Sequence, residues 1–509
     1  MLNEPSYTVY ADPRYVADVG KTADTLRKIA GGNTVDGFQD LLGNKQSQYA
    51  VLAKQISQQQ ADLIKKENLP GVGLQEQDRR VYPEGPLAAQ LLGYVNTENQ
   101  GQYGMEQALN DQLAGKPGLL RAVTDVRGIP LSLSDKNVQD PAEDGKNLVL
   151  SVDRNIQAYV EQALKAGLDK AQAKHGSVVV MDPNTGAVMA MANFPTYDPA
   201  KYYDTKDYTA FQNGVVSNPY EAGSVVKVLT MLAGLNEGVI TPESTYNNTG
   251  STEVDDTTIK NVLQTVNGTR NMEEVFQYSL NTGVVQVLRL LGGGNVNAQA
   301  RNKLFDYFSN HYFLGRKTGI EQGGESAGQV IPPDAEQGNN VRYANMTFGQ
   351  GMDVTMIQLA SAFSAAVNGG TYYKPHMVEG YLLDDNSVSK QAPQVMKPDV
   401  AKVNASNQLK DMLHTARAKS IPGQDKSGYY VAGKTGTSQV IDPKTGKYID
   451  SNAIGSYLGF GGNATPRYVI MVRVMDAQTG GFSGSVAAAP IFADISNWLL
   501  DYLKVQPMQ

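Results

Sequence analysis

The strand-like segments of residues 146–509 gather at the two ends of this region, and helical segments fill its middle. Near the start, the apolar runs Ser177–Met181 and Ala187–Met191 flank the sequence DPNTG, which is typical of a β-hairpin turn. Near the end, Ser456–Phe460 and Tyr468–Val474 are two more apolar runs. The pattern predicts an antiparallel sheet that is assembled from both ends of the region around a central helical block.

The central block is expected to hold four helices, and an amphipathic helix is expected to close the chain, because apolar residues recur there at helical spacing. The four helices are expected at about Ser224–Leu235, Met272–Leu291, Asp353–Asn368 and Val400–Ala418, and the last at about Val486–Lys504.

Residues 1–140 have a different, more polar texture. A stretch rich in Gln and Lys, at about Val35–Glu67, predicts a polar helix. The segment Ser132–Gly145 shows no apolar periodicity and predicts a linker. We therefore expect two domains, at residues 1–140 and 146–509.

The composition excludes several kinds of chemistry. The chain has no cysteine, so disulfides, thiol catalysis and cysteine metal sites are ruled out. Its four histidines are far apart and form no H-x-x-x-H pair, so neither a zinc site nor a histidine base is favoured. The net charge of −7 and the lack of a dense basic run argue against a nucleic-acid partner. No apolar run reaches about 18 residues, so no transmembrane helix is predicted.

Ser224-Val225-Val226-Lys227 has the spacing of a nucleophile and its base. A serine hydroxyl needs a base within hydrogen-bond reach, and residues three apart on a helix lie one turn from each other. Lysine acts as a base only when it is neutral, and burial or a neighbouring cation lowers its pKa. The apolar residues around Lys227 indicate such a setting. A second S-x-x-K, Ser387–Lys390, lies in a polar stretch and is expected to be a surface loop.

Two further motifs follow in order along the chain. Ser279-Leu280-Asn281 is the one S-x-N triplet, and it interrupts a helical pattern, either as a corner facing a cleft or as an ordinary helix cap. K-T-G occurs at Lys317–Gly319, in a Gly-rich loop, at Lys434–Gly436, in a strand-like run that can pair with Ser456–Phe460, and at Lys444–Gly446. We favour the copy at Lys434–Gly436, which continues into Thr437, as the functional one.

The order S-x-x-K, S-x-N, K-T-G resembles the motif set of penicillin-binding proteins and serine β-lactamases. Gly176–Pro195 is similar to the hairpin that opens their transpeptidase domain, and Glu221–Lys227 to their E-P-G-S-x-x-K, with Ala222 in place of proline. Tyr82–Gly118 resembles the pedestal of the monofunctional, class B type. The likeness covers most of residues 75–505.

The resemblance implies an α+β fold. Residues 146–509 would form a penicillin-binding, serine β-lactamase-like transpeptidase domain, with a central antiparallel sheet, helices on both faces and an all-helical subdomain. Residues 1–140 would form an elongated, non-catalytic mixed α/β pedestal. Family members begin with a membrane anchor that this sequence lacks, and they work at the extracytoplasmic face of the bacterial plasma membrane.

The resemblance also implies the roles of the motif residues in cross-linking peptidoglycan stem peptides, without a metal or cofactor. Ser224 would attack the penultimate D-Ala carbonyl while Lys227 takes its proton. Ser279 would relay a proton to the leaving amine, and Asn281 would hold Lys227 and the substrate amide. The remaining roles are a positive field from Lys434, binding of the terminal carboxylate by Thr435, Gly436 and Thr437, and an oxyanion hole from the backbone N–H groups of Ser224 and Thr437.

Stem peptides ending in D-Ala-D-Ala and β-lactams are the implied ligands, and a membrane glycan polymerase and other wall-synthesis proteins are the implied partners of the pedestal. The alternatives are a D,D-carboxypeptidase or a β-lactamase that uses the same site, or a β-lactam-sensing or scaffold protein. Leu280 stands where class A lactamases usually have Asp, which argues against a lactamase.

Overall fold

The computed structural model describes residues 2–116, 118–121, 138–441, 448–478 and 483–508. The chain divides into two compact units, each made of several segments. Unit 1 comprises Met1–Pro86, Tyr94–Gln100 and Asp198–Ala200, and unit 2 comprises Leu87–Gly93, Gly101–Tyr197 and Lys201–Gln509.

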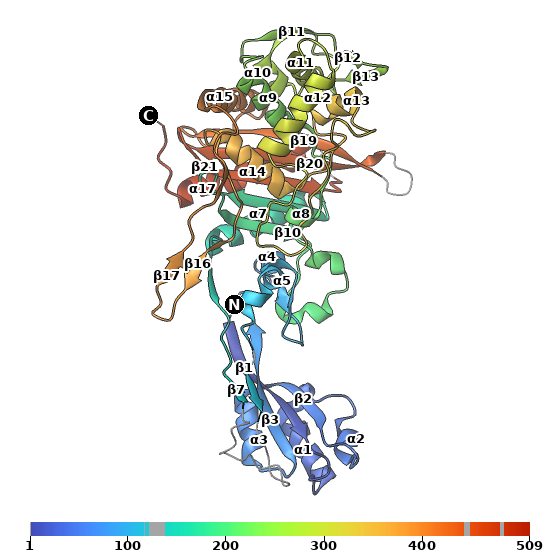
Figure 1. The fold of residues 1–509 in the computed structure, drawn as a ribbon, viewed down its shortest axis with the longest axis vertical. Coiled ribbons are helices and arrows are strands. Elements are labelled where there is room, and N and C mark those ends of the chain that lie inside the picture. The colour runs from blue at the N-terminus through green and yellow to red at the C-terminus, as the bar shows by residue number, and fades with distance from the viewer. Residues whose placement is uncertain (1, 117, 122–137, 442–447, 479–482, 509) are drawn as a thin grey trace. The chain divides into compact units, whose positions relative to one another are not determined.

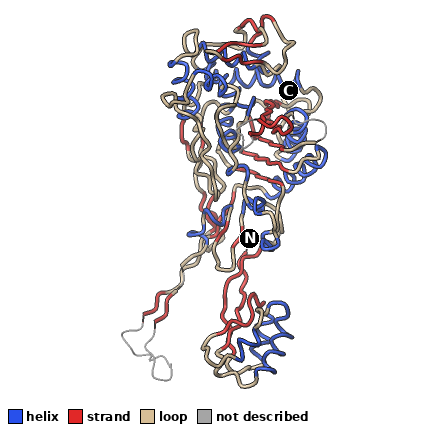
Figure 2. Tube along the Cα trace, turned by 90° about the vertical axis from the view of Figure 1, so that its right-hand side faces the viewer, coloured by secondary structure: helices blue, strands red, loops and turns tan. Residues whose placement is uncertain are grey.

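Unit 1 is built on a three-stranded antiparallel sheet of order β2-β1-β3. Its helices gather on one side of these strands, where Val9, Leu26 and Leu52 are fully buried (Figure 2). The elements are β1 (Leu2–Ala11), α1 (Val19–Ala30), η1 (Gly31–Asn33), α2 (Phe38–Gly43), β2 (Ala50–Ser57), α3 (Gln58–Lys66), β3 (Val72–Val81) and β4 (Tyr94–Val95).

The polar helix predicted at about 35–67 is wrong as a continuous element, because β2 lies in its middle. Leu52 and Ile56 are fully buried in the core of the unit, and the strand pairs with β1. A new helix then starts at Ser57, whose hydroxyl forms a capping box with Gln60. Tertiary pairing has overridden the helix propensity of the Gln and Lys residues.

Unit 2 is built on a five-stranded antiparallel sheet of order β10-β9-β21-β20-β19 (Figure 1). The hairpin β9–β10 comes from the start of the unit, and β21 from its end pairs with β9 in register Val178↔Val472. The predicted sheet assembled from both ends is therefore confirmed. Its strands are β9 (His175–Met181), β10 (Val188–Phe194), β19 (Tyr430–Ile441), β20 (Tyr448–Gly462) and β21 (Pro466–Met475).

Helices cover both faces of this sheet. Alternate strand residues such as Val178 and Val472 pack in one core with α7 (Arg154–Ala171) and α17 (Ala489–Tyr502). The other set, including Val179 and Met471, packs in a larger core with the central helical block. The helices of that block are α9 (Lys227–Asn236), α10 (Met272–Gln277), α11 (Asn281–Leu291), α12 (Ala298–Phe305), α13 (Asn340–Met346), α14 (Met356–Val367) and α15 (Val403–Ser420).

The helices predicted at about 224–235, 353–368, 400–418 and 486–504 are confirmed as α9, α14, α15 and α17. The one predicted at about 272–291 is split into α10 and α11, because Ser279 takes a left-handed conformation with φ of 54°. The smaller helices of unit 2 are α4 (Ala89–Leu92), α5 (Gly104–Ala108), α6 (Asn110–Leu113), η3 (Tyr208–Phe211), α8 (Gly214–Ser217), η4 (Gly223–Val226), η5 (Asp306–His311) and α16 (Gly484–Ala487).

Short strands complete unit 2. They are β5 (Gly101–Gln102), β6 (Leu119–Arg121), β7 (Val138–Asp140), β8 (Asn147–Leu150), β11 (Thr245–Asn248), β12 (Ser251–Val254), β13 (Thr257–Lys260), β14 (Gly268–Asn271), β15 (Tyr372–Tyr373), β16 (Val378–Leu382), β17 (Val388–Lys390) and β18 (Val395–Lys397). Residues 132–137 of the predicted linker lie outside the described residues, and Val138–Asp140 pairs with β6. The domain boundary at 140–146 stays a prediction.

Candidate active site

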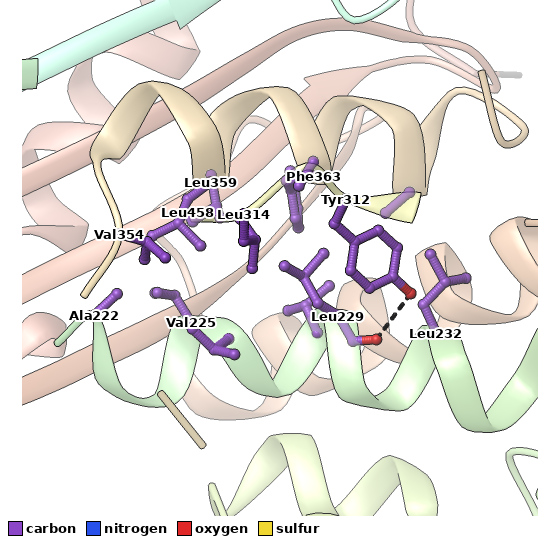
Figure 3. Close-up of a cluster of buried hydrophobic side chains, with 14 of the residues drawn as sticks. Ala222, Val225, Leu229, Leu232, Tyr312, Leu314, Val354, Leu359, Phe363 and Leu458 are labelled. Carbon is purple, nitrogen blue, oxygen red and sulfur yellow. Dashed lines mark hydrogen bonds between the residues drawn. The ribbon is translucent and has the colours of Figure 1, made fainter. Parts of the chain in front are cut away.

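Ser224 lies on η4, which runs directly into α9, and Lys227 lies one turn further along. Ser224 is partly exposed, whereas the Lys227 side chain is fully buried. The cause of that burial is local, because every residue from Val225 to Leu235 is buried. Figure 3 shows Val225 and Leu229 of this segment facing Leu359 and Phe363 of α14.

The turn that presents Ser224 touches the strand that carries K-T-G. Gly223 has φ of 64°, and a Cβ atom there would lie 2.5 Å from the carbonyl oxygen of Thr437. Its N–H donates to the Gly349 carbonyl at 3.1 Å, and Gly349 in turn leaves no room for a side chain against Gly223. Both positions require glycine because two backbones meet without intervening side chains.

Two lysine amines converge on Ser279. The Lys227 Nζ donates to the Ser279 carbonyl at 2.6 Å and to its Oγ at 3.1 Å. The Lys434 Nζ donates to the same Oγ at 2.9 Å and to the Thr435 carbonyl at 3.1 Å. The three motifs predicted from the sequence are therefore joined through a single hydroxyl group.

Burial changes the charge of both lysines. Desolvation lowers the pKa of Lys227 well below its usual 10.5, and the positive charge of Lys434 lowers it further. Desolvation also lowers the pKa of Lys434 to about 7. The lowered pKa favours a neutral Lys227 amine at neutral pH, and these are the two causes that sequence reasoning predicted for it.

Ser279 lies at the break between helices α10 and α11. Asn271 and Glu274 form a capping box that starts α10, and the Leu280 N–H donates back to the Val275 carbonyl at 3.0 Å. Leu280 is fully buried and anchors the corner. The left-handed backbone of Ser279 costs about 1–2 kcal/mol, which the anchored neighbours offset. The corner leaves the Ser279 side chain partly exposed.

Asn281 and the K-T-G strand have contacts that sequence reasoning did not anticipate. Asn281 Nδ2 donates to the Lys260 carbonyl at 2.9 Å, whereas the hydrogen bonds of the Lys227 amine in the described part of the chain run to Ser279. Thr435 Oγ1 accepts from Lys434 Nζ at 3.2 Å. The exposed Thr437 accepts through Oγ1 from the Gly484 N–H at 3.2 Å.

Gly436 also requires glycine at its position. A Cβ atom there would lie 2.9 Å from the Ala222 carbonyl oxygen and 2.9 Å from Val225 Cγ1. This contact sets how close the strand β19 can come to the turn that carries Ser224.

The other described copies of the motifs lie elsewhere. Thr318, in the earlier K-T-G, donates through its N–H and hydroxyl to Glu325 at 2.6 Å each, so this triplet organises a loop. In the second S-x-x-K, Ser387 bonds Asp385 and Lys390 forms an ion pair with Glu379. This copy is exposed as predicted, although Val388–Lys390 form strand β17 rather than a loop.

Sequence reasoning assigned no role to several residues that support the turn carrying Ser224 through contacts with distant parts of the chain. Glu221 accepts from the Gly351 N–H at 2.6 Å, and the Tyr220 hydroxyl lies 3.1 Å from Ser456 Oγ. The Gly484 N–H, at the start of α16, holds Thr437. These pairs are separated by many residues, so no local pattern could have pointed to them.

Within the described residues, no helix has both the length and the apolar character that a membrane crossing needs. No group of three or more metal-ligating side chains gathers in that part of the chain.

Comparison with known proteins assigns both regions of the chain. A model of the penicillin binding protein transpeptidase domain matches residues 176–497, and one of the penicillin-binding protein dimerisation domain matches residues 1–150. Stage V sporulation protein D of Bacillus subtilis (strain 168) is 32% identical over 515 residues, which cover 99% of this chain and 77% of that protein. Peptidoglycan D,D-transpeptidase FtsI of Escherichia coli (strain K12) is 30% identical over 519 residues, which cover 99% of this chain and 82% of that protein.

A solved structure agrees with these matches. The crystal structure of penicillin binding protein 3 from Mycobacterium tuberculosis, in its apo form, matches with a TM-score of 0.72 and 29% identity. The match covers 85% of this chain and 92% of that chain. The chain therefore belongs to the penicillin-binding protein transpeptidase family, in its class B branch.

Proposed function

We propose that this protein is a serine D,D-transpeptidase that cross-links peptidoglycan stem peptides through an acyl-enzyme on Ser224. The observation that carries the proposal is the buried Lys227 amine, one helical turn from a partly exposed Ser224 and joined through Ser279 to Lys434. A neutral amine in this position is the base that a serine nucleophile needs.

In the acylation step, Lys227 takes the proton of Ser224 as Oγ attacks the penultimate D-Ala carbonyl. The carbonyl oxygen becomes an oxyanion, and the backbone N–H groups of Ser224 and Thr437 are its proposed donors. The close approach of Gly223 to the Thr437 backbone supports this pairing. Each such donor is typically worth about 10²–10³ in rate.

The tetrahedral intermediate then collapses. The bond to the leaving amine breaks, and the proton passes from Lys227 through the Ser279 hydroxyl to that amine, so that D-Ala departs. The hydroxyl suits a relay because one oxygen lies within hydrogen-bond distance of both lysines. An amine of a second stem peptide next attacks the carbonyl of the acyl-enzyme, and the new amide bond is the cross-link. The ester bond to Ser224 breaks, and the proton lost by the attacking amine passes through Lys227 to Ser224 Oγ.

The carboxylate of the donor peptide is the proposed ligand of Lys434 and of the hydroxyls of Thr435 and Thr437. Lys434 supplies the positive charge, Gly436 lets the strand lie close to the nucleophile turn, and Thr437 is exposed where a substrate can reach it. Asn281, at the start of α11, is the proposed contact of the substrate amide, and its bond to the Lys260 carbonyl holds it in place.

β-Lactams are the proposed inhibitors, because they present an acyl group to the same serine. Penicillin binding protein 3 of Mycobacterium tuberculosis has been solved in complexes with aztreonam and with ampicillin. A D,D-carboxypeptidase or a β-lactamase would use the same residues and differ in the fate of the acyl group, which passes to water.

The proposed setting is the extracytoplasmic face of the bacterial plasma membrane. Residues 1–140 are the proposed pedestal, which would meet a membrane glycan polymerase and other wall-synthesis proteins. The match of residues 1–150 to a penicillin-binding protein dimerisation domain supports a role of this region in protein contacts.

Acylation by a penicillin tests the nucleophile. Intact-protein mass spectrometry after treatment with benzylpenicillin should show one stable adduct, and peptide mapping should place it on Ser224. Ser224→Ala should lose the adduct, whereas Ser387→Ala, the matched change in the exposed second S-x-x-K, should keep it. An adduct that survives in Ser224→Ala would overturn the proposal.

Cross-linking tests the acceptor. With glycan polymerised from lipid-linked precursor by an added glycan polymerase, the protein should produce dimeric stem peptides that are absent with Ser224→Ala. Release of D-Ala without dimers would identify a carboxypeptidase instead. Rapid loss of the penicillin adduct would identify a lactamase.

A further inference from the structure

Five residues that are register partners of one another form a row across the five-stranded sheet of unit 2, and four of them are polar. Gly436 on β19 pairs with Ser456 on β20, which pairs with Arg473 on β21. Arg473 pairs with Ser177 on β9, and Ser177 with Asn193 on β10. The row begins at the K-T-G strand, and its four polar side chains are all buried.

Arg473, in the middle of this row, is a buried cation that binds the segment leading to Ser224. Arg473 is 3% exposed, and within the described residues its hydrogen bonds run to uncharged oxygen atoms rather than to a carboxylate. It donates to the carbonyls of Gly214 at 3.1 Å and Asn218 at 3.2 Å. Burying a charge without a counter-ion is costly, so such a residue needs a compensating role or compensating contacts.

Tyr220 links this cation to β20, the strand that pairs with the K-T-G strand. The Arg473 guanidinium lies over the Tyr220 ring at 5.0 Å from its centroid. The Tyr220 hydroxyl lies 3.1 Å from Ser456 Oγ, and Ser456 is the register partner of Gly436. Tyr220 precedes Ser224 by four residues, and its backbone pairs with Val354. A single tyrosine therefore contacts the two neighbouring strands β20 and β21.

A chain of hydrogen bonds behind Arg473 compensates its charge. Arg473 donates to Ser177 Oγ at 3.3 Å. Each residue further along the chain accepts from the residue before it and donates to the next one, away from the guanidinium. Acceptor oxygens thus face the cation, and aligned bonds strengthen one another. The links run from Ser177 to Asn193 at 2.9 Å, to Asn213 at 2.9 Å, to Gln322 at 2.8 Å and to the Leu91 carbonyl at 2.8 Å.

We propose that Arg473 and Tyr220 are positioning residues for acylation, which hold the segment before Ser224 on the sheet at the distance from the K-T-G strand that the reaction requires. The inference rests on the proposed function of Ser224. The first reason is that these two side chains contact both the segment before Ser224 and β20, the strand beside Gly436. The second is that both are buried, so neither can contact a substrate. A misplacement of about 1 Å can lower a rate by about 10²-fold.

The test separates the chemical step from binding. For Tyr220→Phe, Arg473→Lys and Arg473→Met, stopped-flow acylation by a chromogenic cephalosporin is measured well below the melting temperature of every variant. We expect the limiting acylation rate of Tyr220→Phe to fall about 10-fold while the dissociation constant of the non-covalent complex changes less than about twofold. Arg473→Lys, which keeps the charge, should retain more activity than Arg473→Met.

Tyr468→Phe is the matched control. Tyr468 is also a buried tyrosine of this sheet, and its hydroxyl bonds Ser496 at 2.8 Å in the other core, so its loss reports destabilisation alone. An acylation rate unchanged in Tyr220→Phe, or lowered equally in Tyr468→Phe, would overturn the inference. Failure of the proposed function would appear separately, as acylation that persists in Ser224→Ala.

Discussion

Lys227 and Lys434 approach the same oxygen, Ser279 Oγ, at 3.1 and 2.9 Å. Two adjacent buried ammonium groups repel each other, and burial disfavours both charges. Desolvation lowers the pKa of both lysines, and the charge of Lys434 lowers the pKa of Lys227 further. This asymmetry supports the proposed division of roles, with the base at Lys227 and the positive field at Lys434.

Replacing the buried base should stabilise the protein at neutral pH. The pKa of Lys227 is lowered in the folded state, so below 10.5 the unfolded chain binds a proton that the folded one lacks, and wild-type stability falls as pH falls. Lys227→Met should abolish acylation and raise the free energy of unfolding by about 1–2 kcal/mol at pH 7. In calorimetry the gain should shrink as pH rises toward 10.5. The exposed Lys317→Met should show no such pH-dependent gain, and a Lys227→Met variant less stable than wild type at pH 6 would contradict the argument.

The charge of Lys434 should also show in the pH profile of acylation. Acylation requires a neutral Lys227 and therefore declines on the acidic side. Lys434→Gln removes a charge that lowers the pKa of Lys227, so that pKa rises and the acidic limb moves to higher pH. Acylation rates of a penicillin across pH measure this shift. Lys317→Gln, in the first K-T-G, should leave the limb in place, and a limb displaced to lower pH in Lys434→Gln would refute the assignment.

At the scale of elements, the site depends on how closely η4 approaches β19. No side chain separates the two elements at Gly223, and a Cβ atom there would come within 2.5 Å of the Thr437 oxygen. The contact involves backbone, which cannot move aside as a flexible side chain can. The proposed oxyanion hole therefore requires glycine at position 223, because any side chain there would force the two backbones apart.

Gly223→Ala should separate this close approach from backbone strain. Gly238 has a similar φ of 69°, yet a Cβ atom there meets nothing within 4 Å. Both alanine variants should lose about 1 kcal/mol of stability through the left-handed backbone, and Gly223→Ala should lose more because its Cβ atom meets the Thr437 backbone. Only Gly223→Ala should lose about 10²-fold in acylation rate. Thermal unfolding and labelled-penicillin kinetics measure the two effects. Equal acylation by both variants would show that the contact does not matter.

At the scale of the whole molecule, the compact unit that contains Ser224 also contains residues upstream of 146, in the segments Leu87–Gly93 and Gly101–Tyr197. Leu91, Met105 and Leu109 belong to its main hydrophobic core. The Gln90 amide is also buried there and donates to the carbonyls of Pro195 at 2.8 Å and Ala210 at 3.0 Å.

A chain that begins at Leu87 should therefore be more stable than one that begins at residue 146. The shorter chain lacks the three large apolar side chains Leu91, Met105 and Leu109. Their loss exposes the core residues that pack against them and costs about 5 kcal/mol. The longer chain should melt cooperatively and acylate, and the shorter one should melt at a lower temperature or aggregate. Equal melting temperatures would favour the domain boundary at 140–146 that the sequence predicts.

Local patterns were enough to predict much of this fold. The hairpin β9–β10 was predictable because its two apolar runs and its DPNTG turn lie within one short segment. The K-T-G at Lys434–Gly436 was correctly placed in a strand beside Ser456–Phe460, because both runs carry strand-like apolar residues. The helix predicted over 35–67 failed because β2 is stabilised by pairing with β1, which no residue of that segment reveals.

The amino-acid sequence alone determined which chemical groups are available, because the serine, the lysines and their helical or extended settings depend on near neighbours. Only the tertiary structure decided that these groups meet. Ser279 reaches Lys227 across 52 residues and Lys434 across 155, and Arg473 reaches Ser177 across 296. Such distances are set by the packing of whole elements on one sheet, and that packing is a property of the entire chain rather than of any segment.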